Sequence, residues 1–405
     1  MRDLRPGKNQ FVEEIRKMRR KSLFLAVCLS VLAVSVSGQV RAQSFEWKVE
    51  ADGFFDNGEY ENIAPSLSKT MYGFRFSPQV GVAYKDFSLF AGTHLITSFG
   101  SPEYLDKAYF TGYFQYRNRH HLFRFGAFPR QELLSDYTNF FIRDTFAYFR
   151  PNMTGLFYRL SGKDNFLSFW LDWTGAQSPL TREAFFVGLS GEQRYKWFFA
   201  QVVGYYYHYA NTKPRSGDGV VHDNGLGQIG LGMDFSRKVR RLYAARLSAH
   251  FMLGYECKRD GGVTPSRMPL GLVLDLHVQY WRFGTRTLYY YGQERFTVPT
   301  DNYSLTYWGN PLLASKSYLQ SKWYVVLFRN DFVNAEAAAV FHLQGNKPGS
   351  QYMVRLQVSL DGGIYGKKEG EERGSRYRFN FIGADKQERA MDDFKRKRKK
   401  QEQDS

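Results

Sequence analysis

The chain has 405 residues, of which 43% are hydrophobic, 18% aromatic and 23% charged, and its mean hydropathy is −0.48. This composition is too polar for a bundle of membrane-spanning helices, because each such helix needs about 20 mostly apolar residues. The formal net charge of +17 is compatible with a nucleic-acid-binding protein. The chain has no motif of that class, however, and the export signal at its N-terminus argues against a location beside nucleic acid.

Residues 1–42 are predicted to be an N-terminal extension followed by a signal peptide. The apolar run 23–38 follows the basic sequence MRRK (18–21), and Val40 and Ala42 stand three residues and one residue before a cleavage point. A basic start, an apolar middle and a small-residue end are typical of a Sec signal peptide. Cleavage would leave Cys257 as the single cysteine, so the mature chain can form no internal disulfide.

Apolar and polar residues alternate repeatedly between 43 and 362. In QYMVRLQVSLDGG (351–363), Tyr352, Val354 and Leu356 fall on one side of an extended chain, and Met353 and Arg355 fall on the other. Side chains of a β-strand alternate between two faces, so each such stretch predicts a strand with one apolar face. Clear alternation occurs at 45–55, 72–84, 107–117, 166–173, 228–235, 245–255, 270–281, 334–344 and 351–363, and weaker alternation at 87–98, 120–128, 154–162, 184–195, 197–209, 285–295 and 316–329.

The connections between these strands are alternately short and long. Short turns are expected at 85–87, 117–121, 162–165, 191–196, 236–241, 283–286 and 329–331, and longer connections at 57–70, 98–106, 129–153, 174–183, 210–224, 257–268, 295–315 and 345–350. Outer-membrane barrels have short periplasmic turns and long extracellular loops. We therefore predict an all-β fold, a closed antiparallel transmembrane β-barrel of about 16 strands over 43–362, with its apolar face toward lipid. A soluble sandwich is less favoured, because it would need a second sheet to cover that face.

The C-terminal segment 363–405 is charged and is expected to lie in the periplasm. Within it, SRYRFNFIG (375–383) also alternates, and if it is the closing strand the barrel has eighteen strands. Pro78 interrupts an otherwise regular strand, because proline has no N–H for the ladder of hydrogen bonds.

A barrel of 16 to 18 strands is too wide for side chains to fill, which predicts an aqueous lumen. The function expected from this is passive diffusion of small hydrophilic solutes, either anions or oligosaccharides, with selectivity set by charges on the wall. The connection 129–153 mixes aromatic and charged residues, and it either folds inward to narrow the pore or caps the outside. The predicted lumen-lining and constriction residues are Arg75, Lys107, Arg124, Asp172, Arg246, Asp275, Glu336, Arg355, Arg130, Asp136, Arg143 and Asp144.

Two other functions are weighed against the channel. A barrel hydrolase would use Ser248 with His250, or Asp275 with His277, but residues two apart on one strand lie about 6–7 Å from each other, too far for a direct hydrogen bond without long side chains. We therefore do not expect an enzyme, a cofactor or a metal site. A structural or assembly barrel would use the basic tail to hold a periplasmic partner. The expected partners are outer-membrane lipid and a small hydrophilic solute, with no nucleic acid, and the oligomeric state stays open.

The rhythm of strands and connections, together with HLFRFGAFPR (121–130) after a short turn, resembles porin-type outer-membrane barrels, similar to phosphate- or carbohydrate-selective porins. GFFDNGEY (53–60) resembles a phrase of outer-membrane proteins from Bacteroidota. The resemblance implies a location in the outer membrane of a Gram-negative cell. It carries no binding residue with it, because no ligand motif matches.

Overall fold

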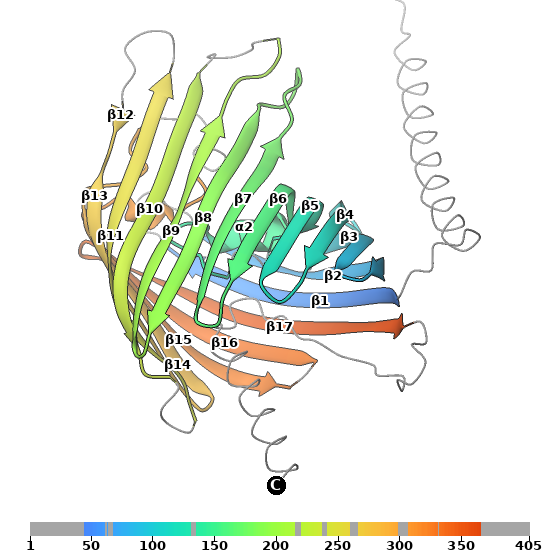
Figure 1. Ribbon diagram of the computed structural model, residues 1–405. Coiled ribbons are helices and arrows are strands. Elements are labelled where there is room, and N and C mark those ends of the chain that lie inside the picture. Colours follow the sequence, from blue (N-terminus) through green and yellow to red (C-terminus); the bar gives the residue numbers. More distant parts are fainter. Residues whose placement is uncertain are drawn as a thin grey trace, which may run out of the picture. The chain divides into compact units, whose positions relative to one another are not determined.

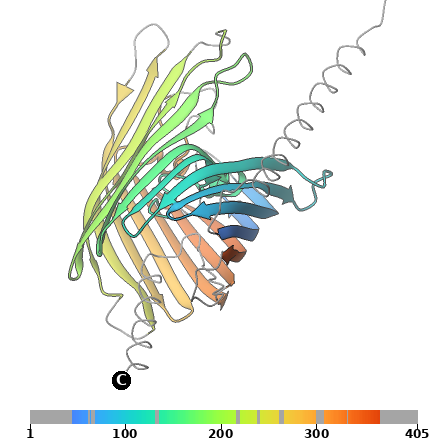
Figure 2. The same cartoon turned by 45° about the vertical axis from the view of Figure 1, so that its right-hand side comes forward.

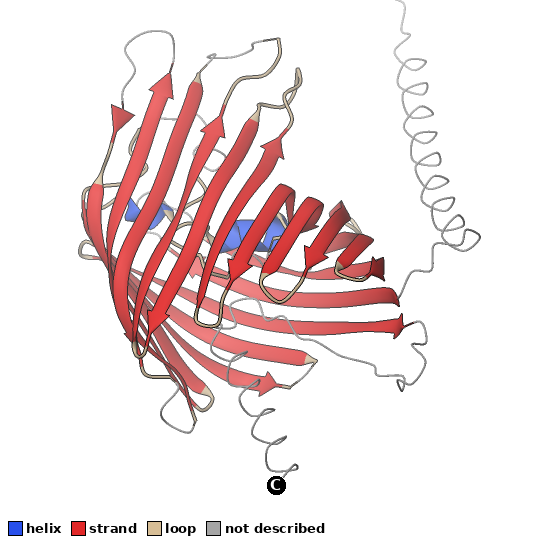
Figure 3. Cartoon of the chain, in the orientation of Figure 1, coloured by secondary structure: helices blue, strands red, loops and turns tan. Residues whose placement is uncertain are grey.

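The computed structural model describes residues 44–60, 63, 68–130, 135–214, 220–236, 241–259, 266–298, 307–330 and 332–365. Within these residues, sixteen long strands form one antiparallel sheet (Figures 1 and 3). They are β1 Ser44–Glu59, β2 Lys69–Tyr84, β3 Phe87–Ser98, β4 Lys107–Arg117, β5 His121–Pro129, β6 Asn152–Ser161, β7 Asn165–Gly175, β8 Ala184–Tyr195, β9 Phe198–Tyr209, β10 Val221–Asp234, β11 Leu242–Arg259, β13 Leu270–Tyr280, β14 Phe283–Gly292, β15 Ser317–Arg329, β16 Val333–Gln344 and β17 Lys347–Tyr365. A two-residue strand, β12 Ser266–Arg267, pairs with β11.

The sheet closes on itself through β1 and β17. Ala51 in the middle of β1 stands opposite Phe76 of β2 on one side and opposite Val358 of β17 on the other, and Figure 2 shows β1 (blue) beside β17. A sheet in lipid must close, because no water is present to satisfy an unpaired edge. The prediction of a closed barrel with about sixteen strands is confirmed, and closure needs no strand from 375–383, which lies outside the described residues.

The apolar face of each strand points outward, as the alternation predicted. On β13, Leu270, Leu272, Leu274 and Leu276 are 39–58% exposed, whereas Val273 between them is 2% exposed. The same pattern holds on β2, where Phe74 and Phe76 are exposed and Arg75 is buried. No helix among the described residues is long and apolar enough to cross a membrane.

Most connections follow the predicted rhythm, with one correction. The stretch 345–350 was expected to be a longer connection, but β16 and β17 are joined by a two-residue hairpin turn, Gly345–Asn346. Gly345 has a φ of +61°, which a glycine accepts without steric cost and which tight hairpins require. β17 therefore starts at Lys347 and reaches Tyr365, slightly beyond the predicted end of the barrel.

The barrel is filled at mid-height by two connections that fold into it. The first, residues 135–151, contains the short helix α2 Asp144–Phe149, and the second, residues 307–316, contains the 3₁₀ helix η1 Pro311–Leu313. Figure 3 draws both helices in blue within the red strands. Their aromatic side chains form one buried core, in which Phe146 stacks on Trp308 with ring centroids 3.9 Å apart. Of the two alternatives for 129–153, the described part, 135–151, shows the inward one.

The 135–151 segment is fixed to opposite parts of the wall. The Tyr137 hydroxyl shares its one proton between the carbonyl oxygens of Leu189 (2.8 Å) and Gly204 (2.9 Å), and it accepts from Trp170 Nε1 (2.8 Å). The Trp170 indole occupies the space beside Gly188, where an added Cβ would lie 2.0 Å from a ring carbon. Any other residue at 188 would therefore displace the indole that holds this end of the segment.

At its other end, the segment reaches β1, where Tyr148 stacks on Phe54 with ring centroids 4.4 Å apart. Between these ends, two residues after Tyr137, Asn139 Nδ2 donates to Gln320 Oε1 of β15 at 2.7 Å. The segment therefore crosses the barrel from side to side, and its contacts position the polar groups described next.

Candidate functional site

The predicted lumen residues lie inside the barrel or on the inward segments, and most are neutralised by a neighbour. Arg75 and Arg355 both bind Asp52, at 2.6 and 2.9 Å. The other ion pairs of the predicted set are Arg130–Asp172 (2.5 Å), Arg246–Glu192 (2.8 Å), Asp275–Arg286 (2.8 Å), Glu336–Lys322 (2.7 Å) and Asp136–Arg159. Arg124 donates to Gln115 (2.9 Å), Lys107 and Arg143 lie over the rings of Phe149 and Phe146, and Asp144 begins α2. Their part in solute selectivity stays a prediction.

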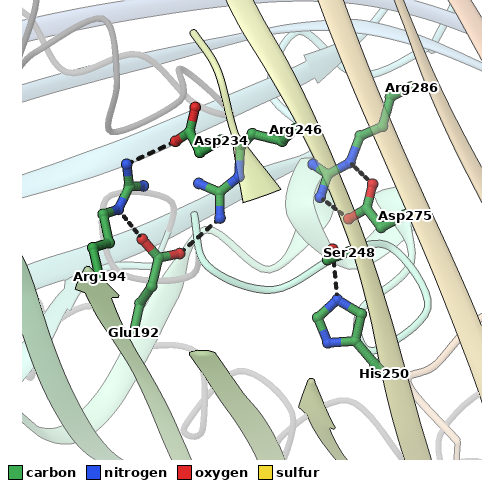
Figure 4. A network of polar contacts seen from close by, with 8 residues as sticks. All are labelled: Glu192, Arg194, Asp234, Arg246, Ser248, His250, Asp275 and Arg286. Carbon is green, nitrogen blue, oxygen red and sulfur yellow. Dashed lines mark hydrogen bonds and ion pairs between the residues drawn. The ribbon is translucent and has the colours of Figure 1, made fainter. Parts of the chain in front are cut away.

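One group of these charges forms a network on the wall of β8, β10 and β11 (Figure 4). Glu192 accepts from Arg194 Nε (2.5 Å) and from Arg246 Nη2 (2.8 Å), and Arg194 Nη1 also binds Asp234 (2.8 Å). Two arginines thus face two carboxylates, so the network has no formal net charge. Beside it, Asp275 binds Arg286 in the same view.

Ser248 and His250 make the contact that their spacing argued against. Ser248 Oγ lies 2.8 Å from His250 Nε2 (Figure 4), because the imidazole is long enough to lean along the strand. The Nδ1 atom of His250 has no hydrogen-bond partner among the described residues, and it packs against Gly230. With Asp275 held by Arg286, no acceptor orients this imidazole, so the pair lacks the third member of a catalytic triad.

A complete three-residue relay lies elsewhere, on β2, β3 and the start of β6. Ser77 Oγ is 2.6 Å from His94 Nδ1, and His94 Nε2 is 2.9 Å from Asn152 Oδ1. The Ser77 side chain is fully buried and His94 is 2% exposed. A hydroxyl, an imidazole and an acceptor in this order form the arrangement that activates a serine oxygen as a nucleophile.

The surrounding hydrogen bonds decide which nitrogen of His94 carries the proton. Asn152 Nδ2 donates to the carbonyl oxygen of Phe110 (2.8 Å), and because a carbonyl only accepts, the amide must turn its Oδ1 toward His94. Oδ1 also only accepts, so His94 Nε2 bears the hydrogen. In the neutral ring Nδ1 is then unprotonated, and it accepts the hydroxyl proton of Ser77.

Two prolines explain why the chain folds this way locally. The register of β2 and β3 places Ser77 opposite His94, and the ladder is interrupted there because the neighbouring Pro78 has no N–H. The pairing of β4 with β5 ends at Gly112 and Ala127, and beyond it the Phe110 carbonyl accepts from Asn152, which stands opposite Pro129 in the register of β5 and β6. The first irregularity leaves Ser77 free to contact His94, and the second leaves the Phe110 carbonyl free to accept from Asn152.

Positive charge lies directly beside the serine. Arg75 precedes Ser77 by two residues on the same inward face of β2, and it shares Asp52 with Arg355. Glu50 of β1 also acts electrostatically on Arg75, so the two guanidinium groups stand with two carboxylates. The Arg75 guanidinium itself favours the development of negative charge on a nearby oxygen.

The helix α2 covers this group. Arg75 Nη1 donates to the carbonyl oxygen of Ala147 at 3.3 Å, and Tyr148 packs on the β1 wall. Burial raises the pKa of the Asp144 carboxyl, an effect that the charges of Lys322 and Arg355 oppose. Burial also raises the pKa of the Tyr148 hydroxyl well above its ordinary value.

The sequence reasoning did not identify Ser77, His94 and Asn152. The three residues are 17 and 58 positions apart, and the strand containing His94 had no clean alternation. The available signal was Pro78, which marked an irregular strand, and Pro129 in the HLFRFGAFPR phrase. No group of three or more His, Cys, Asp or Glu side chains suited to a metal ion occurs among the residues that the structure describes.

Solved structures with barrels similar to this chain include three outer-membrane proteins. A loop-deletion mutant of OmpT from Vibrio cholerae has 8% identity and a TM-score of 0.47, covering 78% of this chain and 99% of its own. OprD from Pseudomonas aeruginosa has 11% identity and a TM-score of 0.40, with coverages of 80% and 97%. OprB from Pseudomonas putida has 8% identity and a TM-score of 0.39, with coverages of 78% and 93%. A search of curated proteins found no match.

The closed sixteen-strand antiparallel sheet with its apolar outer face defines this protein as a transmembrane β-barrel. The link to Bacteroidota and the signal peptide stay predictions, and residues 1–43 lie outside the described part of the chain. The particular family follows from its sequence profile: residues 38–360 match the family described as lipid A 3'-O-deacylase-type, and the chain belongs to it. The prediction that the protein is not an enzyme is therefore wrong, because this is a family of enzymes.

Proposed function

We propose that this protein is an outer-membrane hydrolase that removes an ester-linked fatty acyl chain from a glycolipid of the lipid A class. The observation that carries the proposal is the Ser77–His94–Asn152 relay, in which neighbouring hydrogen bonds leave His94 Nδ1 ready to accept the serine proton. Membership of a family described as lipid A 3'-O-deacylase-type supports the reaction and the class of substrate.

In this mechanism Ser77 Oγ attacks the ester carbonyl carbon while its proton passes to His94 Nδ1. The carbonyl oxygen becomes negatively charged, and the positive potential of Arg75 stabilises it. Collapse of the tetrahedral intermediate breaks the ester bond, and the sugar oxygen leaves with the proton from His94. Water, deprotonated by His94, then attacks the acyl-serine ester, which releases the fatty acid and restores Ser77. Asn152 keeps the imidazole oriented throughout.

Substrate access requires α2 to move. Ser77 is fully buried in this conformation, and the contacts of Ala147 with Arg75 and of Tyr148 with Phe54 hold α2 against the wall. A shift of α2 away from β1 and β2 would open a path lined by the aromatic core of the barrel, which suits an acyl chain. The proposal therefore includes opening of the 135–151 segment as a step in turnover.

Passive diffusion, the function expected from the barrel's width, is disfavoured by the filling of its middle. The Phe146–Trp308 stack and the buried rings around it occupy the space that a solute would cross. Single-channel recording of the refolded chain tests this alternative. Steady open steps in the absence of lipid substrate would favour a channel over a hydrolase.

The experiment for the hydrolase uses the refolded chain from Gln43 in detergent micelles with purified lipid A, and measures released fatty acid and the mass of the lipid product. The wild type is expected to release one acyl chain, and Ser77→Ala to reduce the rate by about 10³-fold or more, as for other serine nucleophiles. Ser248→Ala is the matched control, because Ser248 also contacts a histidine but lacks the orienting group.

Folding of each variant is checked by its heat-modifiable mobility on a gel. No fatty-acid release by the folded wild type would contradict the proposal. So would an equal loss of activity in the Ser248 and Ser77 variants, because the relay around Ser77 would then have no special role.

A further inference from the structure

A second group of charges lies on the outside of the barrel, near the long-connection ends of β9, β10 and β11. His208 stands opposite Asp223 in the β9–β10 register, and Asp223 stands opposite Cys257 of β11, two residues before Arg259. On β9 the buried, inward residues are Tyr205, Tyr207 and Tyr209. His208 alternates with them, so its side chain and those in register with it point outward.

The three side chains form one connected unit. His208 Nδ1 lies 2.6 Å from Asp223 Oδ1, and Arg259 Nη2 binds the other carboxylate oxygen, Oδ2. The Asp223 side chain is 4% exposed, that of His208 19%, and that of Arg259 50%. The Tyr206 side chain of β9 also hydrogen-bonds Asp223. The carboxylate is thus enclosed by its partners, and the charged atoms presented to the surroundings belong to the imidazole and the guanidinium.

The unit lies just beyond the apolar band of the outer surface. Below it on β10, Ile229 and Leu231 are 63% and 71% exposed, and Phe235 marks the short-turn end. The 12 positions from Phe235 to Asp223 span about 40 Å along a strand, or about 30 Å along the membrane normal at a tilt near 40°. Because the apolar band of such barrels is about 25 Å tall, Asp223 lies at the level of lipid headgroups.

Aromatic rings mark the same level. Trp173 stacks on Phe185 with ring centroids 5.0 Å apart, and Phe185 lies 5.0 Å from the His208 ring, all in one register row. Aromatic side chains collect at the membrane–water interface, where one part of the ring is in lipid and another near water. Charged side chains facing lipid are costly below this level, so their position at its edge indicates contact with headgroups.

We propose that His208 and Arg259 bind the phosphate of a phosphorylated lipid of the outer leaflet. The guanidinium offers paired N–H donors that fit phosphate oxygens, and His208 Nε2, which has no hydrogen-bond partner among the described residues, donates when the ring is protonated. Asp223 orients both groups and partly offsets their charge. The rings of Trp173 and Phe185 would then lie beside the first carbons of the acyl chains.

This site is separate from the relay that carries the proposed hydrolysis. β2 and β3 lie about half the circumference of the barrel away from β10 in the order of paired strands, and Ser77 faces the lumen. A lipid held outside β10 therefore does not present its ester to Ser77. The inference goes beyond the proposed function and does not rest on it.

The experiment measures lipid binding to the refolded chain in detergent by native mass spectrometry, with lipid A and enzymatically dephosphorylated lipid A as the two probes. Arg259→Gln and His208→Gln are each expected to weaken lipid A binding by about tenfold, because each removes a charge-assisted hydrogen bond. Dephosphorylated lipid A is expected to bind the wild type as weakly as lipid A binds these two variants. Raising the salt concentration should reduce the difference between the two lipids.

Arg267→Gln is the matched control, because Arg267 is another exposed arginine at the long-connection end, on β12, but it contacts Thr297 instead of the cluster. It should leave binding unchanged. Equal binding of both lipids by the wild type, or unchanged binding by both the Arg259 and the His208 variants, would overturn the inference. Fatty-acid release by the Arg259 variant is expected to equal the wild type at saturating lipid, and its loss would overturn the separation of the two sites.

Discussion

Asn152 offers the most direct test of the relay, because its side chain determines which nitrogen of His94 accepts the serine proton. Asn152→Leu keeps the shape of the side chain and removes its polar atoms. The carbonyl oxygen of Phe110 and the Nε2–H of His94 then lose partners that lie at 2.8 and 2.9 Å. At about 1 kcal/mol for each lost hydrogen bond, the free energy of unfolding should fall by about 2 kcal/mol.

The loss of activity should be larger than this loss of stability suggests. Without Asn152 the imidazole is no longer held with Nδ1 toward Ser77, and misdirected tautomers in such relays reduce turnover by about 10²- to 10⁴-fold. We expect kcat for fatty-acid release to fall by at least about 10²-fold, equivalent to about 2.7 kcal/mol in the activation barrier. KM should change little, because Asn152 does not contact the substrate in the proposed mechanism.

The control is Gln351→Leu, which removes another buried amide. Gln351 Nε2 donates to Asp56 at 2.7 Å, so its loss should also lower the urea midpoint of unfolding. It lies outside the relay and should leave kcat within about twofold, which is about 0.4 kcal/mol in the barrier. Wild-type kcat in a folded Asn152→Leu protein would refute the reasoning that His94 needs this partner.

Three further predictions concern the inward segments and one outer loop. Tyr137→Phe should lower the free energy of unfolding by about 1–3 kcal/mol, measured by urea titration, because backbone carbonyls lose a buried donor; an unchanged midpoint would contradict this. Trp308→Ala should lower it by about 3–5 kcal/mol and produce conductance in planar bilayers, because the stack with Phe146 is lost; a silent, fully stable variant would contradict it. Hydrogen bonds from Ser101 and from the Ser98 backbone N–H hold the pKa of Asp106 below its ordinary value of 3.8. Because the pKa is lowered in the folded loop, the ionised carboxylate stabilises that loop above the ordinary pKa of 3.8, and this stabilisation is lost as the pH falls through the folded pKa. The protection of the Ser98 amide against hydrogen exchange should therefore fall over that pH range. In Asp106→Asn the protection should be low at every pH and should show no such transition.

Much of the fold was readable from local pattern. Alternation of apolar and polar residues identified the strands, including the side of β13 on which Leu272 and Leu274 face lipid. The alternating lengths of the connections identified a barrel and its approximate strand count. These features depend on the period of a strand, on turn length and on the need to cover an apolar face, each of which involves residues close together in the sequence.

The filled lumen was only partly readable. The aromatic and charged composition of 129–153 raised the inward position as one alternative, but it did not reveal the partner segment 307–316. The stack of Phe146 on Trp308 joins residues 162 positions apart. Which connection meets which inside a barrel depends on where each strand ends around the closed sheet, and no local pattern specifies this.

The candidate site was decided by tertiary structure alone. Ser77, His94 and Asn152 are individually unremarkable polar residues in the sequence, and only the register of β2 with β3 and the inward path of 135–151 bring them into contact. By contrast, Ser248 and His250 are close in sequence and in space, yet no third group orients them. A relay requires three groups in one geometry, and in a closed sheet that geometry is determined by strand register and by interruptions such as those at Pro78 and Pro129. The sequence by itself determined which face of each strand meets lipid, because that choice repeats every two residues; the tertiary structure decided which distant polar groups meet, because that choice is made once, when the barrel closes.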